Sequence, residues 1–137
     1  MNSLPVTSMV AAVLACLMFI LTALVSIRRV ELGKQSGDIA QFVFGHGDDE
    51  TLRRRIRAFG NFIEYTPAVL ILFALSEFQG ASYSIMWWLG AAFVIGRLFH
   101  ALGMLFSPRF PLPRAIGMFA TYAALLIPAG WMLINLA

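Results

Sequence analysis

The sequence has few charged residues, a single cysteine and no basic residue near either end. Of its 137 residues, 12% are charged and 60% are hydrophobic, which excludes an ordinary soluble domain, where about a quarter are charged. The lone Cys16 excludes an intrachain disulfide. The first basic residue is Arg28, so the basic region of a secretory signal is missing. We therefore expect the first apolar run to be retained as a helix.

Four apolar stretches are long enough to cross a bilayer, which takes about 20 helical residues. They predict an all-α integral membrane protein with one domain over residues 1–137. The predicted helices cover about residues 5–27, 50–78, 84–106 and 112–136, and the links between them are residues 28–49, 79–83 and 107–113. Pro67 and Pro128 fall inside predicted helices and are expected to kink them.

The basic residues gather beside the first and third links. Nine of the ten lie there: Arg28, Arg29, Lys34, Arg53, Arg54, Arg55, Arg57, Arg109 and Arg114. Because basic residues favour the cytoplasmic side, we expect both termini on the non-cytoplasmic side. Arg54 and Arg55 are expected to face lipid headgroups. Without a soluble surface to support it, nucleic-acid binding is not expected.

Polar side chains also occur inside the predicted spans, where they are costly and usually functional. The second helix carries Arg57, Asn61 and Glu64 at a spacing that places them on one face. The third carries Arg97 and His100. If the two helices form an antiparallel hairpin, Glu64 reaches the depth of Arg97, which we expect to be its partner. Asn61 then reaches the depth of His100.

Two interpretations fit this polar cluster. The side chains could simply lock the helices together through an ion pair and a hydrogen bond. Alternatively, the surplus of positive charge, open toward the basic side, could bind an anionic ligand. A metal site is not expected, because His46 lies in a link, Cys16 lies in the first helix and no ligand spacing occurs. Asp48 or Asp49 is expected to cap the second helix.

The stretch from Arg57 to Pro67, RAFGNFIEYTP, resembles the signature of the MAPEG family (membrane-associated proteins in eicosanoid and glutathione metabolism). Arg97 to His100, the Arg28-Arg29 pair and Pro111 to Arg114 resemble further family features. The resemblance implies a left-handed antiparallel four-helix bundle that forms a homotrimer. It also implies glutathione sites between subunits, near the cytoplasmic face.

The resemblance assigns roles to individual residues. Arg114 would be catalytic by stabilising the glutathione thiolate. The residues implied in glutathione binding are Arg28, Arg29, Arg53, Arg57, Asn61, Glu64, Tyr65, Arg97 and His100. Glutathione would be a co-substrate, no metal would be needed, and the other substrate would be a lipophilic small molecule reaching the site from membrane lipid. The short links are similar to those of bacterial members, which implies the bacterial inner membrane.

The sequence thus predicts a membrane glutathione transferase or peroxidase that acts on lipophilic electrophiles or lipid hydroperoxides. Two alternatives remain. Met104 stands where the family often has a tyrosine, so a non-catalytic protein that binds lipid or a partner is one. The other is a small proton-coupled exporter that uses Glu64.

Overall fold

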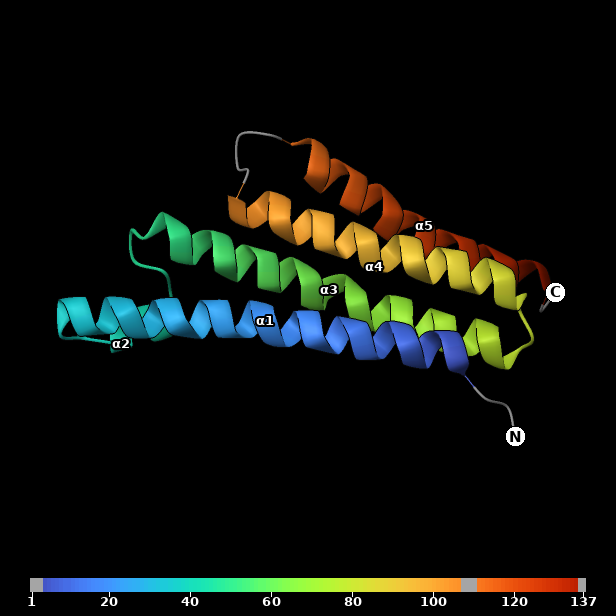
Figure 1. Cartoon of the computed structure of the whole chain (residues 1–137), viewed down its shortest axis with the longest axis horizontal. Helices are drawn as coiled ribbons and strands as arrows, with labels where there is room; N and C mark the ends of the chain where they lie inside the picture. The colour runs from blue at the N-terminus through green and yellow to red at the C-terminus, as the bar shows by residue number, and fades with distance from the viewer. Residues whose placement is uncertain (1–3, 107–110, 136–137) are drawn as a thin grey trace.

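A computed structural model describes residues 4–106 and 111–135 of the chain. Its helices are α1 (Pro5–Ser36), α2 (Ala40–Val43), α3 (Glu50–Phe78), α4 (Tyr83–Phe106) and α5 (Leu112–Asn135). The four long helices lie side by side, and successive ones run in opposite directions (Figure 1). Each is long and apolar enough to cross a membrane. This confirms the prediction of an all-helical chain with four spans, while bundle handedness and subunit number stay predictions.

The first helix is longer than predicted, because α1 continues to Ser36 instead of ending near Ile27. Its polar extension is packed rather than free: Leu32 and Gly33 are buried, and α1 contacts the short helix α2. The helix ends at Ser36, and the N–H of the capping residue Gly37 donates to the Gly33 carbonyl at 3.0 Å. The change from apolar to polar residues marks the end of the lipid-facing part, not the end of the helix.

The helix starts use two kinds of cap. The Asp49 side chain caps α3 by accepting a hydrogen bond from the Leu52 N–H at 2.5 Å, which confirms the predicted aspartate cap. No side chain at the start of α1 caps that helix. Instead, Glu77 near the end of α3 accepts hydrogen bonds from the N–H groups of Val6 at 2.8 Å and Thr7 at 2.9 Å. This carboxylate joins the beginning of α1 to the end of α3.

Helices α4 and α5 approach each other closely through small residues. A Cβ atom added at Gly117 of α5 would lie 2.6 Å from the Cβ of His100 on α4. A larger side chain at this position would push the helices apart, so Gly117 sets their separation. Phe62, Phe73 and Phe93 are fully buried between the helices.

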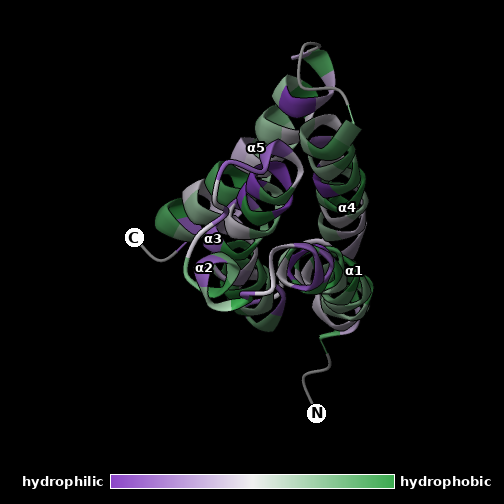
Figure 2. Cartoon of the chain, turned by 90° about the vertical axis from the view of Figure 1, so that its left-hand side faces the viewer, coloured by the Kyte–Doolittle hydropathy of each residue, from purple (hydrophilic) through white to green (hydrophobic). Residues whose placement is uncertain are grey.

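Hydropathy varies along the molecule as expected for a membrane protein. Seen from the end that carries α2, Figure 2 shows hydrophilic residues around α2 and on the nearest turns of α1. The sides of the long helices are mostly hydrophobic in the same view. Large apolar side chains such as Phe19, Trp88 and Leu126 are more than two-thirds exposed, at 73%, 74% and 71%. Such exposure suits contact with lipid rather than water.

Candidate functional site

A cleft of about 370 Å³ brings together residues of three helices. Its lining comprises Ile56, Arg57, Gly60, Asn61 and Glu64 from α3, His100 and Met104 from α4, and Arg114 from α5. The polar residues predicted on one face of the second helix therefore do share a cleft. His100 and Arg114, predicted from separate motifs, join them there.

Local packing positions each wall of the cleft. Residues 57, 61 and 64 recur at helical spacing, so their side chains leave α3 on one side. His100 and Met104 lie one turn apart on α4 and are both buried. A Cβ added at Gly103 would lie 2.9 Å from the Cγ of Arg114. Because Gly103 has no side chain, the stem of Arg114 can lie directly against α4.

Arg97 lies behind the cleft rather than in its lining. Its side chain is almost fully buried, and its guanidinium donates to Asn61 Oδ1 at 2.9 Å and to Thr121 Oγ1 at 3.4 Å. The guanidinium carbon also lies 5.6 Å from the centre of the Phe62 ring, a distance suited to a cation–π contact. Arg97 is thus held by polar and aromatic neighbours from two other helices.

The expected pairing of Arg97 with Glu64 is wrong for the described part of the chain. Neither residue forms an ion pair there, and Asn61 accepts the hydrogen bond in place of the carboxylate. A helical turn rises about 5.4 Å, and an extended arginine side chain reaches further than that. Equal backbone depth therefore does not decide which residue a guanidinium contacts. Glu64 is left exposed at the cleft.

The cleft carries more positive than negative charge. Arg57 and Arg114 supply two guanidiniums, Glu64 supplies one carboxylate, and Arg97 adds a further cation behind Asn61. The buried Nδ1 of His100 and Nε of Arg114 have no hydrogen-bond partner within residues 4–106 and 111–135. Polar atoms that are buried without partners are costly, so these two atoms leave hydrogen-bonding capacity unused beside the cleft. The arrangement fits a ligand with several carboxylates and one ammonium group.

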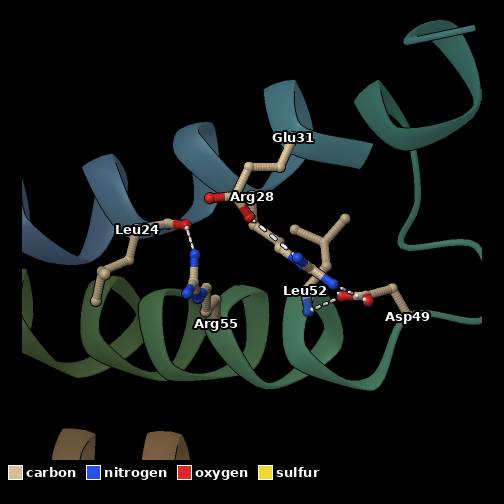
Figure 3. Close-up of polar contacts among 6 residues, drawn as sticks. All are labelled: Leu24, Arg28, Glu31, Asp49, Leu52 and Arg55. Carbon is tan, nitrogen blue, oxygen red and sulfur yellow. Dashed lines mark hydrogen bonds and ion pairs between the residues drawn. The ribbon is translucent and has the colours of Figure 1, made fainter. Parts of the chain in front are cut away.

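Besides Arg97, four of the residues implied in glutathione binding do not line this cleft. Arg28 instead binds Asp49, with Nη2 2.7 Å from Oδ2, and lies 3.0 Å from Glu31 (Figure 3). Arg53 forms an ion pair with Glu50. Arg29 and Tyr65 are also absent from the lining. Their contact with glutathione stays a prediction, as does the contribution of Arg109 to topology, because that residue lies outside the described ranges.

The contact between Arg28 and Asp49 has an electrostatic consequence. The hydrogen bond from the Arg28 guanidinium, assisted by the Leu52 N–H, lowers the pKa of Asp49 below its usual value of 3.8. Asp49 therefore stays ionised as it caps α3 and holds α1. This contact stabilises the basic end of the helix pair, next to the cleft.

Thr121 is a site-supporting residue that the sequence did not indicate. It is fully buried on α5, and its hydroxyl donates to the Gly117 carbonyl at 2.8 Å while accepting from Arg97. A threonine in an apolar helix usually bonds its own backbone, so its presence alone gave no reason to connect it with Arg97. Only the packing of α5 against α4 makes that connection.

The fold and the cleft together define a small helical membrane protein with a polar, cationic site at the basic end of its spans. The sequence pattern of the MAPEG family matches residues 7–134, and the chain belongs to this family. The match extends from within the first predicted span to within the fourth and includes every residue of the cleft.

Two relatives from Escherichia coli are similar to part of the chain. Inner membrane protein YecN of strain K12 is 36% identical over 84 residues, which cover 61% of this chain and 63% of that protein. The protein of the same name from E. coli O6:H1 matches to the same extent. The matched part therefore spans less than two-thirds of these relatives. No solved structure matches the chain.

Proposed function

We propose that this protein is a membrane glutathione transferase or peroxidase that acts on lipophilic electrophiles or lipid hydroperoxides. The observation that carries the proposal is the cleft in which Arg57, Asn61, Glu64, His100 and Arg114 converge. Membership of a family that includes glutathione transferases supports it. The E. coli relatives are named as inner membrane proteins, which supports a bacterial inner-membrane location. The basic residues beside the cleft favour its placement near the cytoplasmic face.

The charges of the cleft match those of glutathione. Near neutral pH the tripeptide carries two carboxylates and one ammonium group, so its net charge is negative. Arg57 binds a carboxylate, and the exposed carboxylate of Glu64 binds the ammonium. Because Arg97 occupies the Asn61 carbonyl oxygen, the Asn61 amide keeps its N–H groups for a second acceptor on the ligand.

Arg114 stabilises the thiolate in this proposal. A free thiol titrates near pH 8.5 and only its thiolate attacks well. Lowering that pKa by about two units requires roughly 2.7 kcal/mol of preferential thiolate stabilisation, which a guanidinium in a partly desolvated cleft can supply. The thiolate then forms a C–S bond as the electrophile loses its leaving group. With a hydroperoxide, it takes the terminal oxygen and releases an alcohol, and a second glutathione converts the sulfenic acid into a disulfide and water.

A homotrimer would complete the site. In the single chain Arg57 and Glu64 are exposed at the mouth of the cleft, so a neighbouring subunit can cover them. Such a neighbour could contribute the arginines that the chain does not bring to its own cleft. We therefore include the trimer in the proposal, with the lipophilic substrate entering from the surrounding lipid.

Replacing Arg114 tests the proposed chemistry. Arg114→Ala should lower turnover at pH 7 by about 25-fold, because the thiolate fraction falls from about three-quarters to about 3% when the thiol pKa returns from about 6.5 to about 8.5. It should also reduce the ultraviolet absorbance of bound thiolate at that pH. Lys34→Ala, which removes an exposed cation at the end of α1, serves as the control and should change neither readout. Turnover of the Arg114→Ala variant equal to wild type would refute the role of Arg114.

The alternatives give different results in the same preparation. Glutathione should raise the unfolding temperature of the wild-type protein, as any specific ligand of the folded state does. Stabilisation without turnover against a panel of electrophiles and hydroperoxides would favour a non-catalytic protein. Proton release on addition of a cationic substrate, without an effect of glutathione, would favour an exporter that uses Glu64.

A further inference from the structure

A second basic pocket lies between α1, α3 and the end of α4. Its volume is about 240 Å³, and it is lined by Leu24, Thr51, Arg54, Arg55, Leu105 and Phe106. We propose that this pocket binds an anionic phospholipid, with the phosphate on the arginines and the acyl chain along the apolar wall. The proposal is independent of the glutathione chemistry, because the two pockets share no residue.

The two pockets open on different faces of α3. At about 100° per residue, positions 51, 54 and 55 lie on average roughly 140° around the helix axis from the α3 residues of the cleft. The basic run at residues 53–57 thus contributes arginines to both pockets. Arg57 belongs to the cleft, whereas Arg54 and Arg55 belong to the second pocket.

Arg55 is held in place as an anion-binding group. Its Nη1 donates to the Leu24 carbonyl of α1 at 2.7 Å (Figure 3). No carboxylate forms an ion pair with Arg55 among the described residues. Its charge is therefore not neutralised, and its other N–H groups remain for a ligand. A guanidinium fixed in this way loses little freedom on binding phosphate.

The neighbouring residues add to the positive charge. The Nε of Arg54 lies 3.0 Å from Glu50, and the same carboxylate also pairs with Arg53. One acid thus serves two guanidiniums, and Arg55 adds a third cation. The hydroxyl of Thr51 supplies a neutral donor beside them. Two charged donors and a hydroxyl can together bind the oxygens of one phosphate.

The rest of the lining identifies the kind of anion. Leu24, Leu105 and Phe106 form an apolar wall, and Phe106 is 75% exposed. Leu24 is near the end of the apolar run of α1, so the pocket lies where phospholipid headgroups meet acyl chains. A free phosphate would use only the arginines. An anionic phospholipid matches both the charged and the apolar parts, as in other basic pockets between membrane helices.

Thermal unfolding of the full chain in detergent tests this assignment. Short-chain phosphatidylglycerol should raise the unfolding temperature, whereas phosphatidylcholine of equal chain length and inorganic phosphate at equal concentration should not. Arg55→Gln should weaken the phosphatidylglycerol effect by about five- to tenfold in apparent affinity. Arg57→Gln, on the other face of α3, should leave it unchanged.

Each other outcome would overturn the proposal. Equal stabilisation by phosphatidylcholine would show a general effect of lipid, and equal stabilisation by inorganic phosphate would show a site for soluble anions. Loss of the phosphatidylglycerol stabilisation in Arg57→Gln would show that the lipid binds in the cleft instead of the second pocket. If Arg55→Gln does not fold, Thr51→Ala and Arg54→Gln take its place, and an unchanged lipid response in both would refute the site. Glutathione binding measured in the same variants tests the cleft separately.

Discussion

Removing the Glu77 carboxylate should measurably destabilise the protein, because this side chain caps a helix to which it does not belong. Its two oxygens accept hydrogen bonds from Val6 and Thr7 at 2.8 and 2.9 Å. A side-chain cap contributes about 1 kcal/mol, and a negative charge at a helix N-terminus contributes roughly 0.3–1 kcal/mol more. We therefore expect Glu77→Ala to cost about 2 kcal/mol, or close to a thirtyfold change in the unfolding equilibrium.

A graded series makes this prediction specific. Glu77→Gln keeps one acceptor oxygen but loses the charge, so it should cost about half as much, near 1 kcal/mol. Gln79→Ala, at an exposed position beyond the end of α3, is the control and should stay within about 0.5 kcal/mol of wild type. Titration with a denaturing detergent, followed by circular dichroism, measures the differences. A loss below about 0.5 kcal/mol in Glu77→Ala would show that water satisfies these N–H groups equally well.

Three further predictions follow from packing and charge. Gly117→Leu should lower the free energy of unfolding by about 1–3 kcal/mol, because the added side chain overpacks the contact between α4 and α5. It should also weaken glutathione binding by displacing His100. A wild-type melting temperature together with wild-type affinity in a binding titration would contradict this. Asn61→Leu leaves the buried Arg97 with one acceptor fewer and should cost about 1 kcal/mol, whereas an equal or higher melting temperature would refute the hydrogen bond. Because the pKa of Asp49 is lowered in the folded state, its stabilisation is complete above about pH 4 and is lost as the pH falls further. Asp49→Asn should therefore show a shallower loss of stability in acid than wild type.

The helices and the shared face of the cleft could be predicted because they depend on local patterns. Apolar run length placed the four spans, and helical spacing alone placed Arg57, Asn61 and Glu64 on one side of α3. The end of α1 could not be predicted in the same way. Polarity indicates where lipid ends, whereas the helix continues to Ser36 through packing against a neighbour that the sequence did not reveal.

Contacts between helices were the harder part of the site. Arg97 was expected beside Glu64, but it bonds Asn61 and Thr121, because a long side chain reaches more than one turn. The cap formed by Glu77 joins residues about seventy positions apart. Such partners depend on side-chain reach and on the separation of helices. Neither is encoded in the spacing of residues along a single helix.

Because α3 lines a pocket on each of two faces, the residue at which the helix begins determines which pocket each of its side chains reaches. Asp49 fixes where the helix begins, and each residue after it turns the next side chain by about 100°. Inserting one residue between Asp49 and Arg57 would therefore rotate all later side chains by about 100° around the helix axis relative to the first turn of α3. The arginines after the insertion would then face different neighbours, although the composition of the chain barely changes. The number of residues between Asp49 and Arg57 therefore determines which of the two pockets each arginine of the basic run faces.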